Sequence, residues 1–596
     1  MRANTKKLTR LFERAIESHR AGDLAGARRG YLEVLKAAPD QFDALHYLGL
    51  LEAQSGRHAE AIIRIRQALS VNPRSAQANS NLGCVFLETH RHEEALACFE
   101  RALTLHSGSV EAHFNRGNAL RGLQRRDAAL ESYDAALRIE PRYVPALVNK
   151  GTLLEELGRE EEAISSLKSA LALKSDQPGI YLNLGLIERK LNHYEQALAH
   201  YDQALALAPG YADALNNRGN VLVDLQRHKE ALASFDRALA VNPDDVETLC
   251  NRAGALMDVR QFEDAVADYS RVIALRPDHA DAHMNDGVCR LMLGDFTKGW
   301  EHYEWRWKTA NPPSNRSFPQ ALWDGKFVDG VLFTWGEQGL GDQILHAGMI
   351  DDLRKHAKHL VVDTKPRLVN LFKRSFSGIE IVAEGEQPRD GRIDAQVPMG
   401  SIGQYLRKRW EDFPARDAGY LVADAERARD LRDRLTADGR FVIGVSWIST
   451  AAYHSEQKSA RLRDFEPILK LPGTRFVDLQ YGDTQEEREA VKESTGVEVS
   501  RLDEIDNRVD IDGLAALITA CDVVVSVSNT TVHLAGALGR KVLLLLPYSR
   551  GSLWYWHAGR EDSPWYSSVR IIRQLAAGDW AGVMRRAAQE LEALRS

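Results

Sequence analysis

The chain has 596 residues, of which 27% are charged and 44% are hydrophobic, a balance typical of a folded protein with more than one hydrophobic core. Its 77 Lys and Arg residues and 84 Asp and Glu residues give a net charge of −7, which argues against general nucleic-acid binding. Five cysteines exclude a disulfide scaffold, and the longest apolar run, residues 542–547, is too short for a bilayer span of about 20 residues. The first seven residues do not resemble a signal peptide, so we expect a cytoplasmic protein.

Internal repeats with a period of 34 residues fill the first half of the chain. Glycine, replaced once by alanine, marks one position of the period: Gly49, Gly83, Gly117, Gly151, Gly185, Gly219, Ala253 and Gly287. Alanine marks a second position: Ala27, Ala61, Ala95, Ala129, Ala163, Ala197, Ala231 and Ala265. Proline marks a third: Pro39, Pro73, Pro141, Pro209, Pro243 and Pro277. Three lattices in fixed phase predict a repeat protein.

The lattices predict a stack of helix pairs. Small residues let the two helices of a unit cross closely, and proline ends the second helix and begins the turn. The array resembles the tetratricopeptide repeat, with about nine units, and predicts an α-solenoid over residues 1–310. The ninth unit keeps Gly287 but becomes rich in Trp and Tyr at residues 295–307. We therefore expect it to cap the array or to dock onto another domain.

An asparagine lattice of the same period precedes the Gly/Ala position by two residues. Its members are Asn81, Asn115, Asn149, Asn183, Asn217, Asn251 and Asn285. Helix propensity gives no reason for Asn in a helix interior, whereas a primary amide offers both a donor and an acceptor. We expect the row to bind the backbone of an acceptor protein, as in the eukaryotic O-linked N-acetylglucosamine transferase that this array resembles. The alternative is that each Asn ties its repeat to the next.

A Pro/Ser/Asn-rich linker at residues 311–320 ends the repeats. Beyond it, short apolar runs alternate with amphipathic helices, which predicts βαβ units and parallel sheets. The predicted strands are residues 331–335, 359–363, 379–383, 441–447, 475–480, 522–527 and 541–546. A charged helix at residues 424–438 divides this half into two Rossmann-like lobes, residues 321–425 and 426–596. The ligand site is expected in the cleft between them.

Two residues at predicted strand ends are candidates for chemistry in this cleft. Asp342 follows a strand and a glycine-rich turn at the start of a helix, although it could be only a helix cap. Lys458 lies in a polar loop after the strand at residues 441–447, together with His454. A lysine there can reach a diphosphate as a point charge, although on its own a solvated lysine is the simpler interpretation.

The start of the helix after residues 522–527 is the third candidate, and the strongest one. Asn529, Thr530 and Thr531 place amide and hydroxyl groups beside the unpaired N–H groups of a helix N-terminus. This combination predicts an anion site, with helix capping alone as the alternative. The chain has no Walker A sequence, no Gly-x-Gly-x-x-Gly fingerprint and no His-Glu-x-x-His motif, and its cysteines lack metal-ligand spacing. A phosphate site without these motifs, between two Rossmann-like lobes, is typical of nucleotide-sugar chemistry. We expect no bound cofactor, and the sequence shows no cluster of metal ligands.

The motifs of the second half resemble the two-lobed GT-B glycosyltransferases, specifically the bacterial heptosyltransferase-like group often fused to tetratricopeptide repeats. They are residues 337–342, the loop from Trp447 to Ser459, residues 479–483, residues 531–539, and residues 562–566 with Arg573 and Gln574. Together they cover most of residues 330–580. Among repeat-fused members, the chain most resembles the flagellin glycosyltransferases of alphaproteobacteria. The resemblance implies an α-solenoid followed by an α/β GT-B fold.

The resemblance also implies roles for individual residues. Asp342 matches the proposed general base of heptosyltransferases, and Lys458 matches a lysine that binds the donor diphosphate. The other donor-binding positions are Ser528, Asn529, Thr530, Thr531 and His533. Relatives carry Asp where this chain has Ser528, which argues against heptose as the donor. A nucleotide-linked acidic nine-carbon sugar, such as a CMP-nonulosonic acid, is the donor that flagellin modification suggests.

The sequence therefore predicts a metal-independent protein O-glycosyltransferase. The repeats would bind a protein acceptor, flagellin in the first instance, and the cleft would bind a nucleotide-sugar donor. One alternative is a transferase whose acceptor is an envelope or lipopolysaccharide glycan. Another is a catalytically degenerate repeat scaffold, a role that Ser528 in place of Asp would fit. No nucleic-acid partner and no membrane span are expected.

Overall fold

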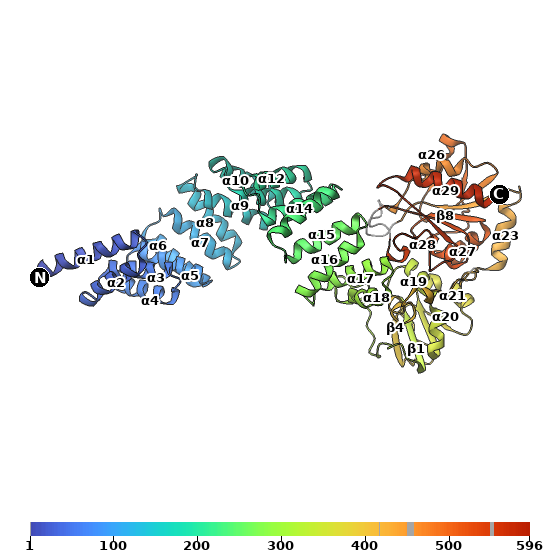
Figure 1. Cartoon of the computed structure of the whole chain (residues 1–596), viewed down its shortest axis with the longest axis horizontal. Helices are drawn as coiled ribbons and strands as arrows, with labels where there is room; N and C mark the ends of the chain where they lie inside the picture. Colours follow the sequence, from blue (N-terminus) through green and yellow to red (C-terminus); the bar gives the residue numbers. More distant parts are fainter. Residues whose placement is uncertain (1, 417, 450–457, 549–552, 596) are drawn as a thin grey trace. The chain divides into compact units, whose positions relative to one another are not determined.

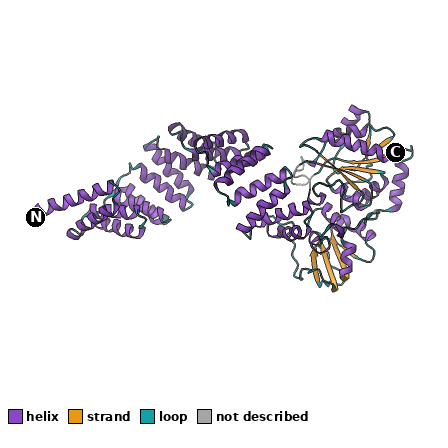
Figure 2. Cartoon of the chain, in the orientation of Figure 1, coloured by secondary structure: helices purple, strands orange, loops and turns teal. Residues whose placement is uncertain are grey.

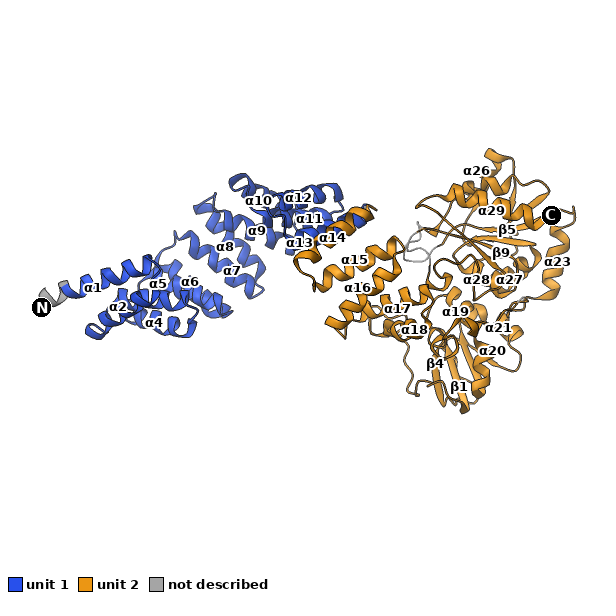
Figure 3. Ribbon diagram, viewed as in Figure 1, with its two compact units in different colours: residues 1–225 blue, residues 226–596 orange. Residues whose placement is uncertain are grey.

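The computed structural model describes residues 2–416, 418–449, 458–548 and 553–595. Within these ranges, the regular structure before residue 309 is helical, and the strands all follow residue 327, where helices alternate with them (Figure 1, Figure 2). The chain divides into two compact units, residues 1–225 and 226–596 (Figure 3). This division falls within the repeats, so the last repeats and the described strands belong to the same unit.

The first unit consists of helices joined in pairs by short turns. They are α1 (Arg2–Arg20), α2 (Leu24–Ala37), α3 (Phe42–Gln54), α4 (His58–Val71), α5 (Ala76–Glu88), α6 (His92–Leu105), α7 (Val110–Gly122), α8 (Arg126–Ile139), α9 (Val144–Glu156), α10 (Glu160–Leu173), α11 (Pro178–Lys190), α12 (Tyr194–Leu207) and α13 (Ala212–Asp224). A Cβ atom on Gly117 of α7 would lie 2.5 Å from Cε1 of Tyr133 in α8, and one on Gly49 of α3 would lie 2.5 Å from Cγ1 of Ile65 in α4. The glycine lattice therefore marks close helix crossings, as predicted.

The turn inside each helix pair contains one residue in the left-handed backbone region. These residues also recur every 34 positions: Gly22, Gly56, His90, Gln124, Gly158 and Asn192 in the first unit, and Gln226, Arg260 and Gly294 in the second. Their φ angles lie between 56° and 84°. Glycine adopts this region without strain and other residues adopt it at a cost. Because the residue type varies from repeat to repeat, this lattice is hard to recognise in the sequence.

The second unit begins with the last repeats. Their helices are α14 (His228–Val241), α15 (Val246–Asp258), α16 (Phe262–Leu275), α17 (Ala280–Leu293) and α18 (Phe296–Tyr303), followed by the 3-10 helix η1 (Glu304–Lys308). The indole N–H of Trp300 in α18 donates a hydrogen bond of 2.8 Å to the backbone oxygen of Arg407, and the N–H of Ala558 donates one of 2.8 Å to the oxygen of Met292. The atypical terminal repeat therefore docks onto both lobes, which confirms its predicted role.

Two parallel sheets form the rest of this unit. Their strand orders are β3-β2-β1-β4 and β10-β9-β8-β5-β6-β7. The strands are β1 (Val328–Trp335), β2 (Ala357–Thr364), β3 (Glu380–Ala383), β4 (Ala395–Pro398), β5 (Phe441–Ser446), β6 (Thr474–Asp478), β7 (Val499–Ser500), β8 (Val523–Val527), β9 (Val542–Leu546) and β10 (Val569–Arg573). The seven predicted strands are present, and β4, β7 and β10 are additional. A repeat solenoid followed by an α/β region confirms the predicted fold class.

Helices cover both sheets. Those of the first lobe are α19 (Leu340–Ala347), α20 (Ile350–Leu353), α21 (Val369–Ser375) and α22 (Gly403–Leu406). Those of the second are α23 (Ala425–Leu435), which matches the predicted dividing helix, α25 (Glu466–Leu469), α26 (Gln485–Thr495), α27 (Ile511–Ala520), α28 (Thr530–Ala537) and α29 (Trp580–Arg595).

The two lobes meet at the helices that follow β1 and β8. A Cβ atom on Gly341 of α19 would lie 3.0 Å from Cδ2 of His533 in α28, so the glycine permits this approach (Figure 1). Arg374 of α21 donates two hydrogen bonds, of 2.6 and 2.7 Å, to the carboxylate of Asp512 in α27. These contacts bring the beginning of α19 and the beginning of α28 to one place, where the predicted cleft residues lie.

Candidate functional site

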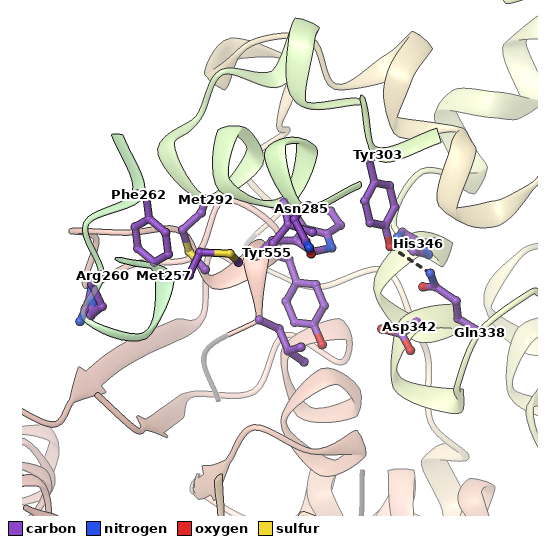
Figure 4. Close-up of a pocket in the computed structure, with 13 residues that line it drawn as sticks. Met257, Arg260, Phe262, Asn285, Met292, Tyr303, Gln338, Asp342, His346 and Tyr555 are labelled. Atoms are coloured by element: carbon purple, nitrogen blue, oxygen red, sulfur yellow. Dashed lines mark hydrogen bonds between the residues drawn. The ribbon is translucent and has the colours of Figure 1, made fainter. Parts of the chain in front are cut away.

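A cavity of about 410 Å³ joins the last repeats to both lobes. The repeats contribute Met257 of α15 and Asn285 of α17, the first lobe contributes Asp342 of α19, and Tyr555 comes from the 3-10 helix η7 (Trp554–Trp556) of the second lobe (Figure 4). Because all these elements belong to one compact unit, the geometry of this cavity is defined. A residue of the asparagine lattice and the predicted general base therefore line the same space.

Asp342 is both a helix cap and a cavity-lining carboxyl group. Its Oδ2 atom accepts a hydrogen bond of 3.2 Å from the N–H of Gly339, which is the capping role that the sequence left open. Burial, and then the negative charge of Glu337, raise the pKa of Asp342 to about 6, against the opposing effects of its backbone hydrogen bonds and of Lys458. A carboxyl group with a pKa near 6 can accept a proton at neutral pH, as a general base must.

Glu337, in the same motif as Asp342, is part of a buried ion-pair network. Its carboxylate accepts hydrogen bonds of 3.1 Å from Nη2 of Arg306 and from the N–H of Gly400. Burial raises the pKa of Glu337 although Arg306 opposes the shift. Arg306 also donates a hydrogen bond of 2.8 Å to Oγ of Ser401. The network fixes the loop after β1 to the end of the repeats, and so positions Asp342.

His346 lies one helical turn after Asp342 and lines the same cavity. It is 2% exposed, and its Nε2 atom has no hydrogen-bond partner among the described residues. Burial, with the positive charge of Arg306, lowers the pKa of His346 to about 3, so the ring is neutral at physiological pH. The i, i+4 spacing within one helix was the sequence signal for this residue.

Lys458 is buried rather than solvated, with 4% of its surface exposed. Burial lowers the pKa of Lys458, and the negative charge of Asp342 opposes this effect. Each of these two residues therefore affects the pKa of the other, as is expected for the predicted base and the predicted diphosphate-binding lysine if they share one site. The simpler interpretation of Lys458 as a surface residue is wrong. His454 lies outside the described residues.

Asn529 caps α28 and ties two strand ends together. Its Oδ1 atom accepts a hydrogen bond of 3.0 Å from the N–H of Thr531, and its Nδ2 atom donates one of 2.8 Å to Oγ of Ser446 and one of 3.0 Å to the oxygen of Ile448. These bonds correspond to the capping alternative. A direct contact of Asn529 with a donor stays a prediction.

Thr530 and Thr531 line a second cavity, of about 230 Å³. Arg367 and Leu340 of the first lobe line its other side, so this cavity lies between the lobes. The first turn of α28 therefore faces a space with an arginine across it. This arrangement suits an anionic ligand, because the helix N-terminus and the guanidinium are both positive.

Ser528 and His533 contact the aromatic side chains of the second lobe. The indole N–H of Trp556 donates a hydrogen bond of 2.9 Å to Oγ of Ser528. His533 lies 3.0 Å from the hydroxyl of Tyr566 through Nδ1, and its ring stacks on Trp556 with centroids 5.2 Å apart. Both side chains are buried. Their observed contacts are those of packing residues, and donor binding by them stays a prediction.

The asparagine lattice lies on the first helix of each pair, and every member is half-buried. Several members donate hydrogen bonds to side chains of the preceding repeat. The pairs are Asn81 with His46 at 2.9 Å, Asn115 with Cys84 at 3.6 Å, Asn149 with Asn118 at 2.8 Å, and Asn183 with Thr152 at 3.4 Å. These bonds join neighbouring repeats, as in the alternative interpretation that each Asn ties its repeat to the next. Asn217 donates to the oxygen of Asp213 at 2.9 Å, and Asn285 lines the cavity beside Asp342.

Two further features bear on binding. Among the described residues, no group of three or more His, Cys, Asp or Glu side chains is placed to hold a metal ion. No helix within the described ranges is both long enough and apolar enough to cross a membrane.

Comparisons with known proteins identify the repeats. One tetratricopeptide-repeat family model matches residues 80–142, 114–178, 182–246 and 250–304, and a second matches residues 40–107. Protein FlbA of Caulobacter vibrioides is 34% identical over 326 residues, a match that covers 50% of this chain and 53% of FlbA. The chain thus spans about half the length of this relative.

Solved repeat structures are also similar to part of the chain. The crystal structure of MamA is 27% identical, with a TM-score of 0.26, and the match covers 27% of this chain and 94% of MamA. YrrB, described as a TPR protein with an unusual peptide-binding site, is 24% identical, with a TM-score of 0.28, over 31% of this chain and 95% of YrrB. The family matches agree with the 34-residue lattices, and the helix pairs of this chain are tetratricopeptide repeats.

Proposed function

We propose that residues 321–596 are a GT-B glycosyltransferase that moves a sugar from a nucleotide-sugar donor to Ser or Thr of a protein acceptor bound by the repeats. The observation that carries this proposal is the shared cavity. It is lined by Asp342, whose pKa is raised to about 6, and by Asn285 of the asparagine lattice. A base that lines the same cavity as the last repeats suits an acceptor that is a polypeptide.

The proposed reaction is a displacement at the anomeric carbon of the sugar. The Asp342 carboxylate takes the proton from the acceptor hydroxyl, the hydroxyl oxygen forms the new bond to the anomeric carbon, and the bond from that carbon to phosphate oxygen breaks. The nucleotide leaves with the electron pair. Lys458 and the N-terminus of α28 stabilise its negative charge. A base of this kind contributes about 10²–10⁴-fold to the rate.

We place the nucleotide in the cavity between the lobes, beside Thr530, Thr531 and Arg367. The positive end of α28 and the guanidinium of Arg367 would offset the phosphate charge. A CMP-nonulosonic acid is the donor we propose, and flagellin is the acceptor. The match to protein FlbA over half of the chain supports a flagellar association, and the resemblance to flagellin glycosyltransferases supports the transfer.

The test is transfer to flagellin by the full chain and by Asp342→Asn. Purified flagellin is incubated with CMP-nonulosonic acid, and intact-protein mass spectrometry follows the added mass. We expect Asp342→Asn to lower the rate by about 10²–10⁴-fold, because the amide cannot accept the proton. Asp351→Asn, which removes an exposed carboxylate from α20, should transfer at the rate of the unchanged chain.

Other outcomes identify the alternatives. If Asp342→Asn transfers sugar as fast as Asp351→Asn, Asp342 is not the general base. Transfer to an envelope glycan but not to flagellin would show that the acceptor is the glycan. Failure to bind any nucleotide sugar in calorimetric titrations would favour the degenerate scaffold.

A further inference from the structure

Arg260 occupies a position where the fold does not need an arginine. It lies in the turn between α15 and α16, with a φ of 64°. The same turn position holds Gly158, Asn192 and Gln226 in preceding repeats, each with positive φ. Because the backbone there favours glycine, and uncharged residues such as Asn and Gln occupy it in other repeats, the turn itself gives no reason for an arginine.

The charge of Arg260 has no acidic partner in the described part of the chain. Burial lowers the pKa of Arg260, and the group is half-buried. Burial and the nearby charge of Arg260 also lower the pKa of Arg573 to about 9, so two cations act on each other here. Other arginines of the last repeats have such partners, because Arg252 pairs with Asp236 and Asp268 at 2.6 Å, and Arg290 pairs with Asp286 at 2.6 Å.

Arg260 lines the cavity that also contains Asp342. Figure 4 shows Arg260, Met257, Phe262 and Met292 toward one end of this cavity and Asp342 at the other, with Asn285 and Tyr555 between them. The Arg260 end therefore combines a positive charge with an apolar wall. Methionine side chains are flexible and adapt to differently shaped apolar partners.

We propose that this cavity binds a segment of the acceptor protein that carries an acidic side chain, which pairs with Arg260, and an apolar side chain, which lies against Met257, Phe262 and Met292. This inference rests on the proposed function, in which the hydroxyl to be modified lies at Asp342. It adds that the last repeats select the acceptor by charge and apolar contact near that hydroxyl, in addition to any contact of amides with the peptide backbone.

The acceptor is a better source of the anionic group than the donor. Arg260, Met257 and Phe262 belong to the repeats, whereas the residues proposed to bind the nucleotide line the other cavity, between the lobes. An acceptor held by Asn251 of α15 and Asn285 of α17, which belong to the same unit as Asp342, would approach Asp342 along these repeat helices. The Arg260 end of the cavity is made by the same repeats.

The test uses the full chain with Asp342→Asn, so that binding is measured without turnover. The probes are short fluorescent peptides with one central Ser, one Leu, and either Asp, Asn or Lys placed at each flanking position in turn. Fluorescence anisotropy gives the affinity of each peptide. We expect the best Asp peptide to bind about tenfold more tightly than its Asn counterpart, which corresponds to ~1.4 kcal/mol, and more tightly still than its Lys counterpart.

Substitutions at position 260 then test the pairing. Arg260→Gln places at this turn the residue that position 226 already carries, so the fold tolerates it, and it should remove the preference for Asp over Asn. Arg260→Glu should reverse the preference, with the Lys peptide binding more tightly than the Asp peptide. Arg271→Gln is the matched control, because it removes an exposed arginine from α16, outside the cavity, and should leave the preference unchanged. Met292→Ser should weaken binding of the Leu peptides relative to matched peptides in which Ala replaces the Leu.

Each outcome is informative. Peptide affinities that do not depend on charge, including no binding by any peptide, would overturn the inference. A tenfold loss of CMP-N-acetylneuraminate affinity in Arg260→Gln, with peptide preference unchanged, would assign the anion to the donor and also overturn it. Charge-dependent peptide binding by a chain whose unsubstituted form transfers no sugar would reject the proposed function while supporting the acidic-segment site.

Discussion

Asp342, the proposed general base, carries a carboxyl group whose burial opposes the stability of the fold. Its carboxyl group lies among buried groups and near Glu337, and both effects raise its pKa to about 6. The ionised form therefore costs free energy in the folded state that it does not cost in the unfolded chain. Strongly shifted groups of this kind concentrate at functional sites, where chemistry and not stability decides the residue.

A consequence is that Asp342→Asn should stabilise the fold at high pH. The carboxyl group has a higher pKa when folded than when unfolded, so its penalty is fully present above about pH 6 and disappears below about pH 4. A shift of about two pKa units corresponds to at most ~3 kcal/mol, and we expect ~1–3 kcal/mol for the free energy of unfolding. Thermal denaturation of both chains from pH 4 to pH 8 measures the difference.

The control for this prediction is Asp351→Asn, at an exposed site in α20. This substitution should cause no comparable pH-dependent increase in the free energy of unfolding. An Asp342→Asn chain that is less stable than the unchanged chain at pH 8 would mean that the capping bond with Gly339 outweighs the burial penalty.

The sequence predicted Asp342, Lys458 and the start of α28 because each follows a recognisable strand. It could not predict that Lys458 is buried or that Arg260 lies in the same cavity as Asp342, since those relations depend on how the repeats pack on the lobes. His346 was within reach of the sequence, because the i, i+4 spacing from Asp342 places it on the same face of a helix. Periodicity identifies elements, whereas a cavity between elements requires their packing.

At the level of elements, the packing of the two helices in a repeat depends on glycine, which has no side chain. The glycine at each helix crossing leaves room for an aromatic or aliphatic side chain of the second helix, as Gly117 does for Tyr133. The long parallel strands of the two sheets were predictable from the sequence, because burial on both faces gives continuous apolar runs. β4 is interrupted by Gln396 and Pro398, β7 has only two residues, and β10 is an edge strand with an exposed Arg570, so none of them gives such a run.

Two glycines of α11 allow a matched test of this crossing. A Cβ atom on Gly185 would collide with the ring of Tyr201, whereas one on Gly179 would meet nothing within 4 Å. Gly185→Ala should therefore lower the free energy of unfolding by about 1–3 kcal/mol through overpacking. Gly179→Ala should raise it by about 0.5–1 kcal/mol, because alanine is the better helix former. Urea denaturation followed by circular dichroism measures both, and equal effects would contradict the close-crossing interpretation.

At the scale of the whole molecule, the second unit carries the proposed chemistry, and hydrogen bonds such as those of Arg374 with Asp512 and of Arg367 with the oxygen of Arg508 join its two lobes. The ion pair of Arg374 and Asp512 joins α21 to α27 with two hydrogen bonds. Under the proposed function, a nucleotide enters the 230 Å³ cavity between the lobes, and separation of the lobes would widen this entrance. Such opening is a local event with its own free energy, distinct from global unfolding.

Loss of this ion pair should make the lobes open more readily. We expect Arg374→Ala to speed amide hydrogen exchange in α19 and α28 by about 5–30-fold, since a charge-assisted bidentate pair contributes about 1–2 kcal/mol. Exchange in α1–α13 should not change. Hydrogen–deuterium exchange with mass spectrometry measures this. Lys326→Ala, which removes an exposed pair with Asp324 within one lobe, is the control, and an equal effect of both substitutions would exclude a role for Arg374 in closure.

The division of the chain at residue 225 has a consequence for how such proteins can change over time. Only the final repeats share a compact unit with the cleft, and each earlier repeat packs on its neighbours alone. Whole 34-residue segments could therefore be duplicated or deleted in the first unit while Asp342, Lys458 and Arg260 keep their surroundings. Array length, which sets how long an acceptor can be held, is then free to vary independently of the chemistry.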